Sequence, residues 1–283
     1  MKISFSPCPN DTFIFHAAVN GIISDAPELD VTYADIDITN HLAAQPDGPD
    51  ILKVSYAALP WIQPDYALLP CGGALGRGCG PMILVNQEES TQLDPRKLSG
   101  KVVAVPSERS TAYLLFRLWS AQNVPNGIGE IVVLPFHDIM PAVRDGKVDA
   151  GLVIHEARFT YPDYGLGCLV DLGHWWETDT GLPIPLGAII AKRSLDIDAT
   201  IHWIRQSLEY AWKHPQVSQD YVLEHAQEMS PEVAQSHIDL YVNGFSRDLG
   251  EEGYHAVHAL LTRAAQENIV PPIDVEALRW DRS

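Results

Sequence analysis

The sequence predicts a two-lobed α/β fold in which mainly parallel sheets are flanked by helices and the C-terminal segment is helical. Short runs of apolar and β-branched residues alternate with helical segments up to about residue 192, which is typical of βαβ units. From residue 198 to about 266 only helical spacing remains. The chain has 283 residues, which is close to the length at which chains divide into two lobes.

The first part of the chain is predicted to hold three strands with helices between them. The strands are Lys2–Ser6, Leu29–Asp37 and Asp50–Ser55. Asn10-Asp11-Thr12 supplies N-cap side chains for a helix that begins near Phe13, and a short helix is expected from Thr39. The Gly-rich stretch Leu69–Pro81 lacks the Lys-Ser/Thr end of a P-loop, so we interpret it as a tight structural loop.

A second unit is predicted to begin near Asn86. Its expected strands, with those at its two borders, are Met82–Val85, Lys101–Val105, Ile131–Leu134, the apolar run ending at Ile154, and Leu186–Ala191. Its expected helices are Ala112–Ala121 and Ile139–Asp145. Residues 1–85 and 188–283 are therefore assigned to a large discontinuous lobe and 86–187 to a small one. A substrate cleft is expected between the two lobes.

Composition and charge exclude several classes of function. The net charge of −18 leaves no basic stripe for nucleic acid and repels anionic membrane surfaces, although a small anionic ligand can still be held by local donors. The N-terminus does not read as a signal peptide and no span for membrane insertion appears, so we expect a cytoplasmic protein with reduced cysteines. Cys71 and Cys79 flank the Gly-rich loop and would pair only in an oxidising compartment. No metal-binding spacing is present.

The clearest candidate for chemistry is His155. The apolar run that ends at Ile154 reads as a buried strand, and it stops abruptly at His155 and Glu156. Ligands gather beyond the carboxyl ends of strands in open α/β sheets, so an imidazole there is a candidate general base. The alternative is a histidine that caps the next helix or bonds a carbonyl group.

Three further groups of polar residues are expected at strand ends around the cleft. Ser110-Thr111 and Asn10-Asp11 each stand at a helix start, where they either cradle an anion or only cap the helix. Ser55 bonds either a ligand or its own turn, and Lys53 can point to either side of its strand.

The remaining candidates are aromatic residues and other histidines. Trp175-Trp176 and Tyr161 either stack on a flat ligand or pack between the lobes. His16 is expected to be packed on its helix. No role is assigned to the histidines of the helical tail, which are His202, His214, His225, His237, His255 and His258.

Several blocks of the sequence resemble the 1,4-dihydroxy-6-naphthoate synthase family of the futalosine pathway of menaquinone biosynthesis. The matching blocks are Ser6–Phe13, Lys53-Val54-Ser55, Ser110–Tyr113, Val153–Tyr161, Asp171–Gly173, Trp175–Glu177 and Gly181–Gly187. They occur in order from the first strand to about Lys192. No single block is specific, but together they are.

The resemblance implies a fold like that of type II periplasmic binding proteins and a lyase activity. The expected reaction converts cyclic dehypoxanthinyl futalosine into 1,4-dihydroxy-6-naphthoate and dihydroxyacetone without a cofactor or metal. It implies that His155 is the proton acceptor, and that Lys53-Val54-Ser55 and Ser110-Thr111 line the site of a small anionic aromatic substrate. Glu156 is then expected to support the turn that aims His155. Chorismate dehydratase of the same pathway and a non-catalytic solute-binding protein remain alternatives, and the oligomeric state is left open.

Overall fold

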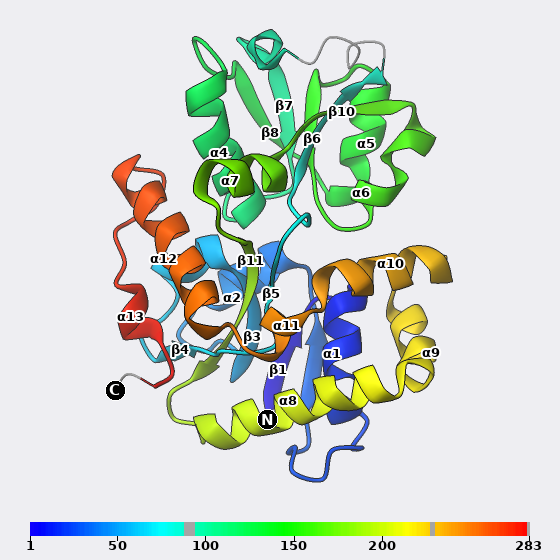
Figure 1. The fold of residues 1–283 in the computed structure, drawn as a ribbon, viewed down its shortest axis with the longest axis vertical. Coiled ribbons are helices and arrows are strands. Elements are labelled where there is room, and N and C mark those ends of the chain that lie inside the picture. Colours follow the sequence, from blue (N-terminus) through cyan, green and yellow to red (C-terminus); the bar gives the residue numbers. More distant parts are fainter. Residues whose placement is uncertain (88–93, 227–229, 282–283) are drawn as a thin grey trace.

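The fold consists of two sheets in two lobes, as Figure 1 shows. A computed structural model describes residues 1–87, 94–226 and 230–281. The first sheet has the order β2-β1-β3-β11-β4, with β5 also paired to β11. Its strands are β1 (Lys2–Phe5), β2 (Asp30–Tyr33), β3 (Ile51–Ser55), β4 (Tyr66–Leu68), β5 (Ala74–Gly76) and β11 (Ile184–Lys192). The second sheet has the order β10-β6-β9-β7-β8. Its strands are β6 (Met82–Asn86), β7 (Val102–Val105), β8 (Glu130–Val133), β9 (Ala150–Val153) and β10 (Leu166–Asp171).

Both sheets are mixed, which corrects the expectation of mainly parallel sheets. The strands of the βαβ units are parallel, as the sequence pattern predicts. The strands β6 and β11, by which the chain passes between the lobes, pair antiparallel with β9 and β3. The reason lies in the register, because Gly187 near the start of β11 stands opposite Ser55 at the end of β3, and Met82 stands opposite Val153. A strand that enters a sheet from the cleft runs against the strands that end there.

Helices cover both sheets. Those of the first lobe are α1 (Pro9–Val19), α2 (Ile36–Leu42) and the 3-10 helix η1 (Tyr56–Trp61). The second lobe carries η2 (Pro95–Leu98), α4 (Thr111–Asn123), α5 (Phe136–Arg144), α6 (Ala157–Thr160), η3 (Tyr161–Tyr164) and α7 (Leu172–Thr180). The C-terminal helices are α8 (Ile197–Lys213), α9 (Pro215–His225), α10 (Pro231–Tyr241), α11 (Gly244–Arg247), α12 (Gly250–Gln266) and α13 (Val275–Leu278). These C-terminal helices lie against the first lobe (Figure 1). Residues 227–229, which belong to the predicted helical region, lie outside the described residues.

Some local predictions were wrong. The strand predicted to reach Asp37 ends at Tyr33, and α2 begins at Ile36, because a short apolar–polar alternation also fits the first turn of a helix. Helix α1 begins at Pro9 and not beyond Asn10-Asp11-Thr12, since a proline is pre-organised for the first helical position. Strands β4, β5 and β10 and helix α7 were not predicted, and β5 lies inside the Gly-rich stretch Leu69–Pro81 that was interpreted as a loop. Among the described residues no helix is long and apolar enough to cross a membrane.

A single apolar cluster runs through both lobes. It contains Leu52 and Val54 of β3 together with Val103 of β7 and Leu152 of β9, and each of these side chains is fully buried. Because this core is close-packed, the ends of β3 and β9 are held in fixed positions relative to each other. The polar residues that follow those strand ends therefore share one location.

The strand that leads to His155 is packed tightly under α5. A Cβ atom at Gly151 of β9 would lie 2.6 Å from Cγ2 of Ile139 and 2.8 Å from Cγ2 of Val143. The glycine is therefore required by the close approach of the helix, not by its own backbone angles.

Gly151→Ala is expected to lower the free energy of unfolding by about 1–3 kcal/mol, because overpacking shifts α5 or β9. Urea denaturation of the purified variant measures this loss. Gly244→Ala is the matched control, since a Cβ at position 244 would meet nothing within 4 Å. It should change the stability by no more than about 0.5 kcal/mol. Equal stability of the two variants would contradict the packing argument.

Candidate active site

Residues from both lobes and from the helical tail line one cavity of about 630 Å³, part of which is open to solvent. Its titratable or hydroxyl-bearing lining residues are Ser6, Asp11, Lys53, Ser55, Cys79, Ser110, Thr111, His155, His237 and Tyr241, and Asn10 adds an amide. The predicted site residues thus come together here, with one exception. Val54 lies between Lys53 and Ser55 on the strand, so its side chain points to the opposite face and is buried in the core.

His155 stands two residues beyond β9 in a left-handed conformation, with φ at 55°. Such a backbone is uncommon for residues other than glycine, and it costs of order 1–3 kcal/mol unless the surroundings over-determine it. The turn is held by main-chain bonds, because the Arg158 N–H donates to the His155 carbonyl (3.3 Å) and the Phe159 N–H to that of Glu156 (2.8 Å). The expected support from Glu156 therefore comes through its carbonyl group.

The imidazole of His155 is bounded by three neighbours. Its Nδ1 lies 3.6 Å from Sγ of Cys8, and its ring centroid lies 5.5 Å from that of Phe136 and 6.0 Å from that of His237. Burial raises the pKa of the Cys8 thiol well above its ordinary value, so the thiol stays neutral. With Nδ1 against Cys8, Nε2 is the ring nitrogen that is left for the cavity.

A buried ion pair forms the floor of the cavity. Nζ of Lys53 donates to Oδ1 of Asp11 at 2.6 Å, and both side chains are at most 3% exposed. Asp11 also accepts from Oγ of Ser6 (2.9 Å) and from Nδ2 of Asn10 (2.7 Å), and Lys53 donates to the Gly72 carbonyl (3.3 Å). Asn10 and Asp11 were expected either to cradle an anion or to cap the helix, and they make no side-chain cap bond. Asp11 holds Lys53 instead, and Asn10 donates to Asp11.

The hydroxyl groups around the cavity have different duties. Ser55 accepts from Nδ2 of Asn40 (3.0 Å), so its own O–H remains able to donate to a ligand. Ser110 caps α4 by accepting from the Tyr113 N–H, and Thr111 donates to the Leu186 carbonyl while it accepts from the Ala57 N–H. These last two side chains are thus structural, but they present the N-terminus of a 13-residue helix to the cavity.

His237 and Tyr241 of α10 are site residues that sequence reasoning missed. They stand four residues apart, so they share one face of the helix, and both line the cavity. Nε2 of His237 lies 3.0 Å from Oδ1 of Asn10, whereas Nδ1 has no partner among the described residues. Burial, with the nearby His155 and Lys53, lowers the pKa of His237 well below its ordinary value, so the ring is neutral. Nothing in the helical pattern of the tail separates these two residues from the other buried ones.

The aromatic residues weighed for stacking do not line the cavity. Trp176 is fully buried and donates from Nε1 to the Pro183 carbonyl (3.0 Å), and Trp175 packs against the guanidinium of Arg263. Tyr161 packs on the apolar cluster beneath α5. All three side chains are thus packed, although Tyr161 packs within the second lobe and not between the lobes as the alternative expected. His16 is buried as expected, with Nδ1 3.1 Å from Oγ of Ser218.

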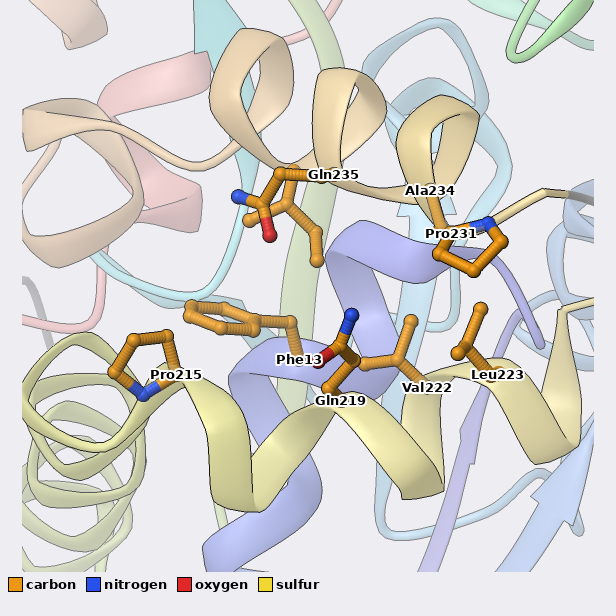
Figure 2. Close-up of a pocket in the computed structure, with 9 residues that line it drawn as sticks. Phe13, Pro215, Gln219, Val222, Leu223, Pro231, Ala234 and Gln235 are labelled. Atoms are coloured by element: carbon orange, nitrogen blue, oxygen red, sulfur yellow. The ribbon is translucent and has the colours of Figure 1, made fainter.

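Figure 2 shows a second and smaller cavity, of about 270 Å³, between α9 and α10. It is lined by Phe13, Pro215, Gln219, Val222, Leu223, Pro231, Ala234, Gln235 and Ile238. None of these side chains is titratable, so this cavity offers no acid–base chemistry. The described residues also contain no group of three or more His, Cys, Asp or Glu side chains placed to hold a metal ion.

Two lobes with a polar cavity where their strand ends meet define a periplasmic-binding-protein-like fold, and this predicted class is confirmed. The periplasmic aliphatic sulphonate binding protein SsuA from Escherichia coli matches with a TM-score of 0.71, over 100% of this chain and 92% of that chain. The identity is 16%, so the similarity shows the fold alone.

The chain belongs to the menaquinone biosynthesis family, whose model matches residues 1–266. A 1,4-dihydroxy-6-naphtoate synthase from Streptomyces coelicolor is 61% identical over 99% of this chain and 98% of the relative. A second synthase of that name, from Thermus thermophilus, is 44% identical over 96% of each chain. The resemblance noted in the sequence is thereby confirmed, and the protein is an enzyme of menaquinone biosynthesis.

Asp11→Asn is expected to lower the free energy of unfolding by about 3–5 kcal/mol, because it leaves the Lys53 ammonium buried without its counter-charge. Lys53→Met should also destabilise, and the double variant should lose less than the sum of the two single losses. Urea denaturation of the three variants and the wild type measures this coupling. Strictly additive losses would show that the two charges do not depend on each other.

Acidification is expected to destabilise the protein through His237. In the folded protein the His237 ring stays neutral, whereas in the unfolded chain it takes up a proton below about pH 6.5. The stability that depends on a neutral ring is therefore fully present above that pH and is lost progressively below it. The slope is at most ~1.4 kcal/mol per pH unit. The free energy of unfolding, measured from about pH 7.5 to about pH 5.5, should fall less steeply in His237→Gln than in the wild type. His174→Gln, at an exposed histidine of α7, is the control and should keep the wild-type slope.

Proposed function

We propose that this enzyme is a lyase that converts cyclic dehypoxanthinyl futalosine into 1,4-dihydroxy-6-naphthoate and dihydroxyacetone, with His155 as the general base. The observation that carries the proposal is the position of His155, held at the end of β9 by a left-handed turn and facing a cavity shared by both lobes. The name of the 61% identical relative supports the choice of reaction.

The residues around His155 suit such a reaction. The neutral imidazole takes a proton through Nε2, since histidine is the side chain suited to proton transfer near neutral pH. Negative charge that develops on a substrate oxygen is stabilised by the Lys53 ammonium and the Ser55 O–H, which are pre-organised by Asp11 and Asn40. Carbon–carbon bond cleavage that yields an aromatic ring has a driving force of its own.

The substrate carboxylate is proposed to lie at the N-terminus of α4. The N–H groups of Thr111 and Ala112 make no hydrogen bond within the described part of the chain, and both residues line the cavity. A helix N-terminus favours an anion there. The sulphonate-binding protein of the same fold takes an anionic ligand, as its name states.

The lobe assignment and the cellular location are proposed as well. The strand pairing supports two lobes close to the expected 1–85 with 188–283 and 86–187, but with the borders at the starts of β6 (Met82) and β11 (Ile184), because β6 pairs in the second sheet and β11 in the first. The four unpaired cysteines and the kinship with biosynthetic enzymes support a cytoplasmic location.

His155→Asn is expected to lower kcat by about 100- to 10,000-fold, because a general base contributes that much. Binding of the intact substrate should remain, since asparagine tolerates the left-handed backbone and is a smaller polar side chain that blocks no part of the cavity. Product formation is followed by mass spectrometry after incubation with cyclic dehypoxanthinyl futalosine, and chorismate is tested in parallel.

His174→Asn, at an exposed histidine of α7, is the matched control and should keep the wild-type rate. Wild-type turnover by His155→Asn would refute the assigned base. Dehydration of chorismate would establish the sister enzyme, and binding of the substrate without turnover by the wild type would establish a solute-binding protein.

A further inference from the structure

The buried side chain of His237 lines the cavity but takes no part in the mechanism above. Three buried side-chain atoms have no hydrogen-bond partner in the described ranges, namely Oη of Tyr56, Nδ1 of His237 and Oη of Tyr254. His237 alone of the three also lines the cavity, and its side chain is 1% exposed. Buried polar atoms are nearly always paired, so an unpaired one beside a ligand cavity needs an explanation.

The hydrogen-bond network fixes which ring nitrogen of His237 carries the proton. Asp11 is ion-paired to Lys53, so it is a carboxylate and can only accept. The Asn10 atom 2.7 Å from Asp11 is therefore the amide nitrogen, and the amide oxygen faces His237. That oxygen requires a donor, so Nε2 of His237 carries the hydrogen.

The unpaired Nδ1 is consequently a bare lone pair. A second proton on the ring is opposed by burial and by the positive charge of Lys53, so the ring stays neutral. A lone pair repels a carboxylate, and it bonds only a group that donates a hydrogen. The acid group of the ligand therefore lies elsewhere, and the partner of Nδ1 is a hydroxyl or an N–H.

We infer that His237 is a specificity-determining residue whose Nδ1 accepts a hydrogen bond from a hydroxyl group of the substrate. The inference rests on the proposed function, in which the part of the substrate released as dihydroxyacetone is rich in hydroxyl groups and has no N–H. It assigns opposite tasks to the two faces of the site. The His155 face removes a proton, and the α10 face recognises the hydroxyl-bearing part and places it within reach, since the two imidazole rings are 6.0 Å apart.

Two substitutions separate recognition from a purely structural role. His237→Gln places an amide near the position of Nε2, so it keeps the donor to Asn10 and loses the acceptor at Nδ1. His237→Asn places an amide near Nδ1, so it keeps an acceptor for the ligand and loses the bond to Asn10. His16→Gln, at a buried histidine outside the cavity, is the matched control.

The variants are compared by kcat/KM with cyclic dehypoxanthinyl futalosine and by the substrate Kd in a His155→Asn background. His237→Gln should raise KM and Kd by about 10- to 100-fold, because the substrate hydroxyl then has no acceptor in the site, and losing one hydrogen bond of this kind weakens binding by about that factor. His237→Asn should stay within about 5-fold of the wild type in Kd, although its stability falls. His16→Gln should keep the wild-type kcat/KM.

The opposite pattern, with His237→Gln normal and His237→Asn impaired in binding, would overturn the inference and leave His237 as a support for Asn10. Wild-type kinetics in both variants would overturn it as well. Failure of the proposed function has a different signature, because the wild type itself would then release no 1,4-dihydroxy-6-naphthoate, and the inference would fall with it.

Discussion

The buried ion pair between Lys53 and Asp11 is the interaction on which the rest of the site depends. Removing two charges from water is costly, and such a pair persists only where further hydrogen bonds engage it. Here Ser6, Asn10 and the Gly72 carbonyl supply them. Because Asp11 can only accept, every neighbouring donor and acceptor has a fixed direction, out to His237. The pair thus determines the hydrogen-bond polarity of the whole cavity floor.

How much of this could be read from the sequence depends on how local each signal is. The end of β9 just before His155 was predictable, because a short apolar run that stops at a polar residue describes the strand and its end together. The duty of Asn10 and Asp11 was not, because two side chains near a helix start fit capping as well as an ion pair with a strand far along the chain. His237 was missed for a related reason, since only the docking of α10 brings it beside Asn10 and His155.

The fold of this enzyme also occurs in proteins that bind sulphonates, so the architecture does not specify chemistry. In the proposed mechanism the features with a chemical purpose are His155 and His237, whose ring centroids lie 6.0 Å apart. The apolar core that both lobes share thereby sets the distance between the proposed base and the proposed hydrogen-bond acceptor.

The left-handed backbone at His155 restricts which residues can occupy that position at all. Glycine, asparagine, aspartate and histidine enter this conformation most readily. Glycine has no side chain, asparagine takes up no proton at neutral pH, and aspartate would set a negative charge against an anionic ligand. The left-handed turn and the proposed proton transfer are independent requirements, and among these residues only histidine meets both. The proposed base at this point of the chain is therefore selected twice, once by its shape and once by its reactivity.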